Sequence, residues 1–500
     1  MTTRIKTISG ALAALLLISL LTISFAGCGS DSGGTTAETD SGTAAAETTT
    51  EETAPFDGLP PDLRFDGAKY VIYSREDQIW MNEMVTDEMN GEIVNDAVFN
   101  RQKYVEDRLG VEIGVVRAPG IWGNEGKFFD RLRGSVQSGD NEFQLVAGYA
   151  YFVTALATEG IFTNLLHVPY LNFDQPWWNS NLRDELTLCN QLYFAGGDLS
   201  YTMIAQMFAT FFNKSMAEKY AVPDLYETVR AGKWTYDTLY ELSASIANDI
   251  DGDGEMTAAD EYGLVLPIGN HCDLFFPAFD QPLTARGESG EIVIRMGDER
   301  AVMIADAVLR LYKENEGVFA KEEDKEDTYA PFINGSALLN IAVMNFAIDK
   351  LRDSSFEYGI IPVPKYDESQ KDYHTLAQDA YSLFCVPKNA GDLEMIGAVT
   401  EAMAAESYFS VTPAFFETAM KYKYSTDENS IEMLDIVRSG ALFNFGFVNS
   451  VSCENMIHIF RYMVMEKKPY TSLYAKNESK YQAALTKLVD AYKGLQQLQG

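Results

Sequence analysis

Histidine is scarce in this sequence, whose 500 residues include only His167, His271, His374 and His458. None of the four has the spacing of a paired metal site such as HExxH. The chain also lacks GxSxG, GxGxxG and a phosphate-binding loop; the nearest approach, GIWGNEGKF at 120–128, has the wrong spacing and no Ser or Thr after Lys127. These absences argue against the common hydrolase, zinc-protease and nucleotide-binding signatures. A carboxylate pair for glycoside cleavage leaves no such signature, so that alternative stays open.

Cysteines and positively charged residues are also few. The sequence has five cysteines and no CxxC; apart from Cys28 they are Cys189, Cys272, Cys385 and Cys453. Two disulfides are compatible with an exported protein, but we expect buried free thiols. Lysine and arginine number 39 against 73 acidic residues, which gives a formal net charge of −34. Such a charge argues against nucleic acid and polyanions as partners.

The first 27 residues have the pattern of a signal peptide. Arg4 and Lys6 precede an apolar run at 11–23, and small residues follow before Cys28. The ending Phe25-Ala-Gly-Cys28 is similar to a lipobox, in which Cys28 is lipidated, with palmitate among its acyl groups, and begins the mature chain. Phe25 departs from the usual aliphatic residue, and a plain transmembrane anchor is the alternative. Either way we expect an extracytoplasmic protein anchored to the outer face of the cytoplasmic membrane.

Residues 28–57 have a composition that opposes folding. They are rich in Ser, Thr, Gly, Ala and acidic residues, and no Lys or Arg occurs between Cys28 and Arg64. Such a segment cannot bury apolar surface, so we expect a disordered tether. The chain from Gly58 onward is long enough for two domains.

Strand and helix periodicities alternate after the tether, in the order 69–74, 90–109, 111–116, 127–136 and 143–147. This alternation predicts a mainly parallel sheet covered by helices, an α/β arrangement. Ligands of such sheets bind beyond the carboxyl ends of the strands. Trp122, Tyr149 and Tyr151 follow predicted strands and are therefore candidates for the rim of a cleft.

Further strand patterns cover 191–198, 207–213, 262–266 and 290–296. Helices are expected from Lys214, after Lys233, and from the caps Asp298 and Asp392. In the helix after Asp298, five residues are expected to share one face: Met303, Ile304, Ala307, Val308 and Leu311.

The stretch 356–388 reads FEYGIIPVPKYDESQKDYHTLAQDAYSLFCVPK. Its apolar runs at 358–363 and 380–386 have the length of buried strands, and each ends in Pro-Lys. Pro362 and Pro364 exclude a helix and suit a strand end. A polar loop separates the runs, as expected where a chain passes from one lobe to another beside a ligand cleft.

The segment Tyr358-Gly-Ile-Ile-Pro-Val-Pro-Lys-Tyr-Asp-Glu-Ser-Gln370 resembles bacterial extracellular solute-binding proteins of family 1, the sugar receptors of ABC importers. Four further segments resemble the same family: Ala404-Ala-Glu-Ser-Tyr408, Met433-Leu-Asp435, Trp177-Trp-Asn179 and Phe211-Phe-Asn-Lys214. The resemblance covers nearly the whole mature chain. It implies a two-lobed periplasmic-binding-protein-like fold (type II), in which each lobe is a sheet flanked by helices and the ligand cleft lies between the lobes.

The resemblance also implies lobe boundaries and a function. Lobe 1 is expected at 58–204 plus 382–425 and lobe 2 at 205–381 plus 426–500, with the first crossing near Thr202–Gln206. The implied protein is a monomeric, non-enzymatic lipoprotein that binds a sugar or oligosaccharide and delivers it to ABC permease subunits. The alternatives are a receptor for peptides or another solute, a surface glycan-active enzyme, and an adhesion or scaffold lipoprotein.

A sugar site needs aromatic planes for the C–H faces of the ring and polar groups for its hydroxyls. The aromatic and imidazole candidates are Trp122, Tyr149, Tyr151, Trp177, Trp178, Tyr201, His271, Phe346 and Tyr381. The polar candidates are Asp198, Asn345 and Asp379. For any single aromatic, core packing is the alternative. The resemblance favours the segments around Asn345, Phe346, Asp379 and Tyr381, which line the cleft in similar receptors.

The segment Asp249-Ile-Asp-Gly-Asp-Gly-Glu-Met-Thr-Ala-Ala-Asp260 matches the EF-hand loop pattern. Its last position carries Asp where Glu is usual, and a helix is expected before it and a strand after it. Four carboxylates so close together repel one another without a cation, although a solvated acidic turn is the alternative. We therefore expect a structural calcium site with the ligands Asp249, Asp251, Asp253, Glu255, Thr257 and Asp260.

Overall fold

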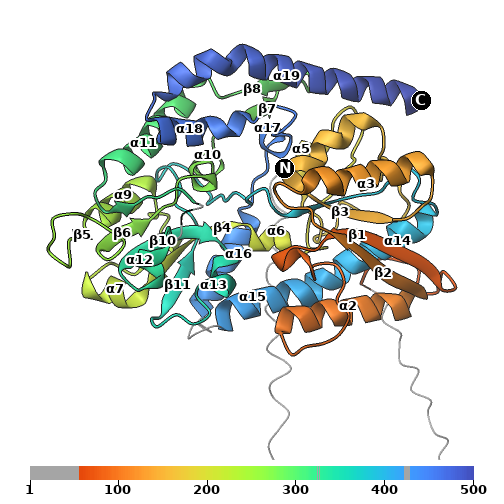
Figure 1. The fold of residues 1–500 in the computed structure, drawn as a ribbon, viewed down its shortest axis with the longest axis horizontal. Coiled ribbons are helices and arrows are strands. Elements are labelled where there is room, and N and C mark those ends of the chain that lie inside the picture. Colours follow the sequence, from red (N-terminus) through yellow and green to blue (C-terminus); the bar gives the residue numbers. More distant parts are fainter. Residues whose placement is uncertain (1–55, 324, 326, 422–427, 500) are drawn as a thin grey trace, which may run out of the picture. The chain divides into compact units, whose positions relative to one another are not determined.

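Two separate β-sheets form the framework of the structure (Figure 1). The structure is a computed structural model that describes residues 56–323, 325, 327–421 and 428–499. The predicted signal peptide and Cys28 lie outside the described residues. No helix within the described ranges combines the length and the apolar character that crossing a membrane requires.

The first sheet has the strand order β12-β3-β1-β2. β1 pairs in parallel with β2 and β3, whereas β12 is antiparallel to β3. The predicted α/β alternation is confirmed, because helices connect the three parallel strands. The bounds are β1 (Ala68–Arg75), α2 (Ile93–Leu109), β2 (Val111–Ala118), α3 (Glu125–Ser138), β3 (Leu145–Tyr149) and β12 (Ser382–Cys385).

Helices cover both faces of this sheet, as two tyrosines of β1 show. The Tyr70 hydroxyl lies 2.7 Å from the hydroxyl of Thr400 in α14 (Leu393–Glu406), while the Tyr73 ring stacks on Phe128 of α3. Residues three apart on a strand point to opposite faces. β3 and most of β1 are therefore buried on both sides, whereas the edge strand β2 is mostly half-buried.

The second sheet has the order β11-β4-β10-β6-β5, and β9 also pairs with β6. β10 is parallel to β6 and antiparallel to β4, so this sheet is mixed. The strands are β4 (Phe208–Asn213), β5 (Ala247–Asn248), β6 (Glu261–Val265), β9 (Val318–Phe319), β10 (Ala337–Val343) and β11 (Tyr358–Ile361). The predicted hairpin strand at 290–296 is also present, as β8 (Ile292–Ile294) paired with β7 (Thr284–Arg286).

Most of the remaining chain is helical. The bounds are α4 (Ala150–Val153), α5 (Ser180–Leu186), α6 (Thr202–Ala205), α7 (Lys214–Lys219), α8 (Leu225–Arg230), α9 (Tyr236–Ala244), α10 (Phe275–Ala278), α11 (Glu299–Glu314), α12 (Ala330–Ile333), α13 (Phe346–Asp349), α15 (Thr412–Lys421), α16 (Glu428–Ser439), α17 (Phe445–Val448), α18 (Ile459–Glu466) and α19 (Tyr470–Gln499). α19 contacts both halves of the fold: the Tyr470 hydroxyl donates to Met296, and the Gln191 amide donates to the carbonyl of Tyr492.

Two antiparallel segments join the sheets. After α6 the chain enters β4 of the second sheet, and the segment before β12 returns to the first. The Gln378 N–H donates to the carbonyl of Gln206, and the Phe208 N–H donates to that of Leu376. The passage from the second sheet back to the first thus lies within 356–388, the stretch that the sequence analysis predicted to connect the lobes.

Some local predictions are wrong. Residues 191–198 do not form a strand, because the chain turns at Cys189 and Asn190, both at positive φ, and pairs with β12 only through Ala195 and Phe384. Met303 is 53% exposed, so it lies off the buried face of α11. The four cysteines after residue 28 are free, but Cys189 is only half-buried.

Candidate ligand-binding site

Side chains from both sheets meet beyond the carboxyl ends of parallel strands. Tyr149 ends β3 and Tyr151 follows it, Asp273 lies in the segment after β6, and Asp379 precedes β12. Arg461 of α18 interacts electrostatically with both carboxylates, and Asp379 does so with both tyrosines. We call these five residues the carboxylate–tyrosine cluster. Its position is the one at which sheets of this kind bind ligands.

Charge is concentrated and buried in the carboxylate–tyrosine cluster. The Arg461 Nε donates to Asp273 Oδ2 at 2.7 Å, and Asp273 is only 1% exposed. Burial raises the pKa of Asp273 to about 7; Arg461 lowers this pKa, and Asp379 and Glu323 raise it. Burial likewise raises the pKa of Asp379 to about 6, against the opposing effect of Arg461. Both carboxyls therefore lose stabilising hydration that a bound ligand could replace with hydrogen bonds.

Aromatic rings extend from the carboxylate–tyrosine cluster toward solvent on both sides. The Tyr151 ring lies 5.5 Å from Trp122, which is 65% exposed, and 6.0 Å from His458, with the Tyr151 and His458 planes 10° apart. His458 in turn lies 6.4 Å from Tyr462, and the Tyr151 hydroxyl donates to Asn455 at 2.8 Å. The rings thus connect the loop after β2 and the short helix α4 after β3 with the C-terminal part of the chain.

Several buried polar atoms around the cluster have no hydrogen-bond partner among the described residues. They are Asp273 Oδ1, His271 Nδ1, His458 Nε2, Trp80 Nε1 and, on the guanidinium that lies 5.1 Å from the Tyr149 ring, Arg75 Nε and Nη1. The other nitrogen of His271, Nε2, lies 3.3 Å from the Tyr329 hydroxyl. Unpaired buried polar atoms are costly, so clustered ones indicate a place where a polar ligand supplies the partners.

The structure brings Trp122, Tyr149, Tyr151, His271 and Asp379, all predicted from the sequence, to this region. The sequence did not point to its other members, Trp80, Asp273, Asn455, His458 and Arg461. Asp273 could have been found, because it follows a predicted strand within the segment that also holds His271. Nothing in the helical patterns of the C-terminal segments distinguished His458 or Arg461.

Other predicted residues have partners inside the protein. The indole N–H groups of Trp177 and Trp178 both donate to Glu401 of α14. The Tyr201 hydroxyl donates to the carbonyl of Ile79. Phe346 packs on Phe211, Tyr329 and Phe332, and the buried Tyr381 packs on Phe443. Asn345 begins α13, half-buried, without a side-chain capping bond.

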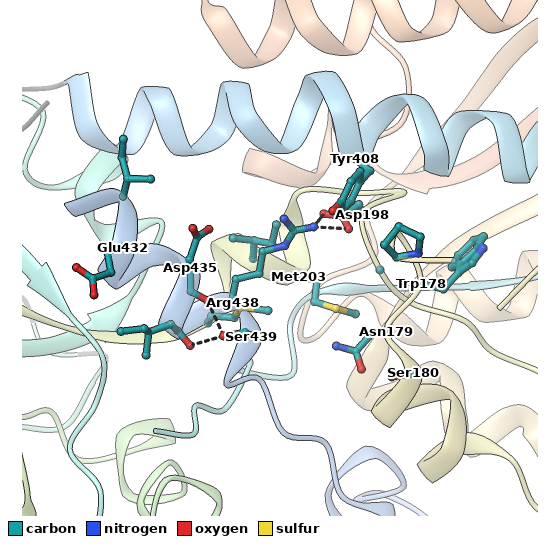
Figure 2. A pocket seen from close by; sticks show the side chains of 16 residues that line it. Trp178, Asn179, Ser180, Asp198, Met203, Tyr408, Glu432, Asp435, Arg438 and Ser439 are labelled. Carbon is teal, nitrogen blue, oxygen red and sulfur yellow. Dashed lines mark hydrogen bonds and ion pairs between the residues drawn. The ribbon is translucent and has the colours of Figure 1, made fainter. Parts of the chain in front are cut away.

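Asp198 and Trp178 line a separate pocket of about 780 Å³, beside α6 and α16. Figure 2 shows Arg438 reaching across this pocket toward Asp198, next to Tyr408. The Arg438 Nη2 lies 2.8 Å from Asp198 Oδ2, and the Thr412 hydroxyl donates to Asp198 Oδ1. The Asp198 carboxylate is therefore already satisfied by neighbours from the same chain.

The acidic loop forms a compact turn between strands. The carboxylates of Asp249, Asp251 and Asp253 are exposed, and their ligand atoms lie within 4.8 Å of one another. Asp260 is buried instead, and its two oxygens accept from the N–H groups of Ile250 and Thr257. The Thr257 hydroxyl donates to Asp260 as well. Three of the expected carboxylates thus fit one cation, while the fourth holds the loop backbone.

The expected helix before this loop is present as α9, and β5, which pairs antiparallel with β6 after the loop, lies between α9 and the loop. α9 already ends at Ala244, and the Glu255 N–H donates to Asp253. The loop is therefore a hairpin turn and not part of a helix–loop–helix unit.

No family profile matches the chain, and no curated protein matches it either. Among solved structures, a cyclo/maltodextrin-binding protein complexed with maltotetraose has a TM-score of 0.56 at 13% identity, covering 85% of this chain and 98% of that one. A cyclic alpha-maltosyl-1,6-maltose binding protein from Arthrobacter globiformis has a TM-score of 0.56 at 14% identity, covering 84% and 99%. The maltose/maltodextrin-binding domain MalE from Bdellovibrio bacteriovorus, bound to maltotriose, has a TM-score of 0.51 at 16% identity, covering 85% and 100%.

These likenesses confirm the two-lobed periplasmic-binding-protein-like fold that the resemblance implied. At such identities they establish the fold alone. Each of the three proteins is described as a binding protein or domain and not as an enzyme.

Proposed function

We propose that this chain is the substrate-binding protein of an ABC importer and that it binds a sugar or oligosaccharide. The observation that carries the proposal is the carboxylate–tyrosine cluster, which gathers residues of both lobes beyond the strand ends. The solved structures with the same fold include sugar complexes. The aromatic rings and unpaired polar atoms near the cluster match the mixed surface of a sugar.

The mechanism follows from the fact that the residues proposed to contact the ligand belong to both halves of the fold. Tyr151 belongs to the half built on the first sheet, whereas Asp273 belongs to the half built on the second. Ligand contacts with both halves favour the closed arrangement of the lobes, which a permease then recognises. The protein itself catalyses no reaction, and ATP hydrolysis belongs to a partner.

The anchor and location belong to the same proposal. Lipidation of Cys28 holds the mature chain at the outer face of the cytoplasmic membrane, and residues 28–57 act as its tether. In that position a monomer can collect solute and present it to the permease subunits.

We also propose that Asp249, Asp251 and Asp253 bind a structural calcium ion. Carboxylate oxygens are the ligands that calcium prefers. A hydrogen bond from the Asp253 N–H lowers the pKa of Asp251, but desolvation and the neighbouring carboxylates outweigh it and raise that pKa overall. This repulsion supports a cation in the loop. The ion would stabilise the turn between β5 and β6.

Calorimetry and thermal shift with a saccharide panel test the main proposal. A ligand at about 100 times its dissociation constant adds about 2.7 kcal/mol of stability. Asp379→Ala is expected to weaken binding by about 1–3 kcal/mol, because the ligand group that Asp379 contacts loses its partner. Binding of peptides but not of saccharides would favour the alternative receptor, and turnover of a saccharide would favour a glycan-active enzyme.

A further inference from the structure

We infer that the ligand presents hydroxyl or ammonium groups, and no carboxylate or phosphate, to the carboxylate–tyrosine cluster. The inference rests on the proposed function, because it takes this cluster to be where the solute binds. It narrows the ligand to neutral or aminated saccharides and excludes uronates and phosphorylated sugars.

The balance of charge is the first argument. Asp273, Asp379 and Glu323 all act electrostatically on the single guanidinium of Arg461. Asp273 and Asp379 are 1% and 9% exposed, so water screens them poorly. With the carboxylates ionised, three negative charges face one positive charge. An added anion would meet the excess charge in a medium of low dielectric constant, where like charges repel strongly.

Neighbouring groups do not reverse this balance. Burial lowers the pKa of both His271 and His458, so the two imidazoles are neutral at pH 7. The Arg75 guanidinium lies 5.1 Å from the Tyr149 ring. It donates to the Ser382 hydroxyl, which in turn donates to the buried carboxylate of Glu83. Glu83 is the carboxylate that acts most strongly on Arg75, although it also acts on Arg101, and Arg75 Nε and Nη1 keep no hydrogen-bond partner among the described residues. Even with Arg75 counted, the carboxylates of Asp273, Asp379 and Glu323 outnumber the two guanidinium groups of Arg461 and Arg75.

Hydrogen-bonding capacity is the second, independent argument. The Asp273 Oδ1 is a buried acceptor without a donor among the described residues, since both bonds from Arg461 go to Oδ2. A hydroxyl or an ammonium group can donate to Oδ1, whereas an ionised carboxylate or phosphate only accepts. His458 Nε2 and His271 Nδ1 are ring nitrogens without a hydrogen bond, the second of them 3.9 Å from Glu323 Oε1, and an uncharged polyol can donate to one and accept from another.

Thermal shift of the purified mature chain tests the inference with one library of neutral, aminated, uronic and phosphorylated saccharides at pH 7.5. Stabilisation is expected only from neutral or aminated members. The strongest neutral binder is then compared by calorimetry with its own derivative oxidised at C6 to the carboxylate. The carboxylate is expected to bind at least about 100-fold more weakly, because a like charge in such a site costs several kcal/mol.

Two variants locate the source of the discrimination. Asp379→Asn and Glu323→Gln each remove one negative charge. Each is expected to reduce the affinity ratio, the affinity for the neutral sugar divided by that for its carboxylate derivative, by about tenfold. Glu323 is part-exposed, so its variant remains informative if the buried one folds poorly. Asp306→Asn, on the exposed side of α11, is the matched control and should leave the ratio unchanged.

The outcomes separate the inference from the proposal beneath it. A uronate or phosphorylated sugar that binds as tightly as its neutral parent would overturn the inference and leave the receptor function standing. The inference would also be overturned if the affinity ratio between the neutral sugar and its carboxylate derivative stayed the same in Asp379→Asn and Glu323→Gln. If no saccharide of any charge binds, the proposed function fails, and the inference fails with it.

Discussion

Arg461 and Asp273 stand 188 positions apart in the chain, yet the guanidinium Nε lies 2.7 Å from the carboxylate Oδ2. The bond fastens α18 to the segment that follows β6. Because Asp273 is almost completely buried, the arginine is also the main group that favours its charged form. The Arg461–Asp273 pair therefore affects both the stability of the fold and the electrostatics of the carboxylate–tyrosine cluster.

Arg461→Ala is expected to lower the free energy of unfolding by about 3 kcal/mol, because it strands a buried carboxylate. Urea unfolding at pH 8 measures the loss. Adding Asp273→Asn to Arg461→Ala should recover at least half of it, since no stranded charge remains. Arg133→Ala removes the exposed pair with Glu159 and should cost less than about 1 kcal/mol. Equal losses for the buried and exposed pairs would contradict the prediction.

Asp379 is expected to make stability depend on pH. Burial holds its pKa at about 6, above the ordinary value of 3.8. Between these values the folded chain keeps a proton that the unfolded chain has released. The contribution of Asp379 to the free energy of unfolding is therefore greatest below pH 4 and falls by roughly 2–3 kcal/mol as pH rises through 6.

Asp379→Asn removes this titration. Other buried groups, including Asp273 with a pKa of about 7, titrate in the same range, so the measured quantity is the difference between the wild type and the variant at each pH. Denaturant unfolding at intervals from pH 4 to pH 8 should show the wild type losing stability relative to the variant as pH rises. A difference that stays constant across the range would show that Asp379 titrates normally.

Trp122→Ala is expected to weaken saccharide binding without changing stability. The side chain is 65% exposed, and its ring packs in a tilted orientation against Tyr151 and Phe152. Its loss removes an aromatic surface from the ligand, at a cost of about 1 kcal/mol in binding free energy. Calorimetry and thermal unfolding of the same sample separate the two effects. Trp122→Phe should retain most of the affinity, and a variant equal to the wild type would remove Trp122 from the site.

Chelation is expected to lower the melting temperature of the wild type, and calcium should restore it more effectively than magnesium. Asp251→Ala should abolish the response because it removes one of the three clustered carboxylates. Glu288→Ala, in the turn between β7 and β8, is an exposed acidic control that should respond like the wild type. Identical melting curves in chelator and in calcium would rule out the ion.

Cys28→Ser is expected to leave the protein without a lipid anchor. Metabolic labelling with a palmitate analogue should mark the membrane-associated wild type and not the variant. The Cys189→Ser variant changes a different cysteine and should be labelled normally. Label retained in Cys28→Ser would show that the lipobox interpretation is wrong.

The strands and helices of the fold were largely predictable because their signals are local. The alternation of strand and helix periodicities predicted β1, β2 and β3, and the capping position of Asp392 marked the start of α14, where its side chain accepts from two N–H groups. The prediction at 191–198 was wrong for a reason that no local pattern contains. An apolar run becomes a strand only if another strand offers its edge over several residues, and there β12 meets the run at a single point.

The candidate site was only partly predictable. Residues directly after strands could be assigned to the expected ligand side, and this reasoning led to Tyr151, a member of the carboxylate–tyrosine cluster. Trp177 and Trp178 have the same composition signal as ligand-binding aromatics, but their indole N–H groups are used by Glu401. Whether an aromatic faces a ligand or a partner in the core depends on what packs against it, and composition does not contain that information.

The sequence by itself determined the order of the elements and the acidic loop, because each depends on neighbouring residues. Only the tertiary structure decided which distant residues share a site. Arg461 lies on a C-terminal helix and reaches Asp273 and Asp379 because α18 packs against the segment after β6. A buried charge is stable only beside its partners, and those partners are set by how the helices and sheets pack together.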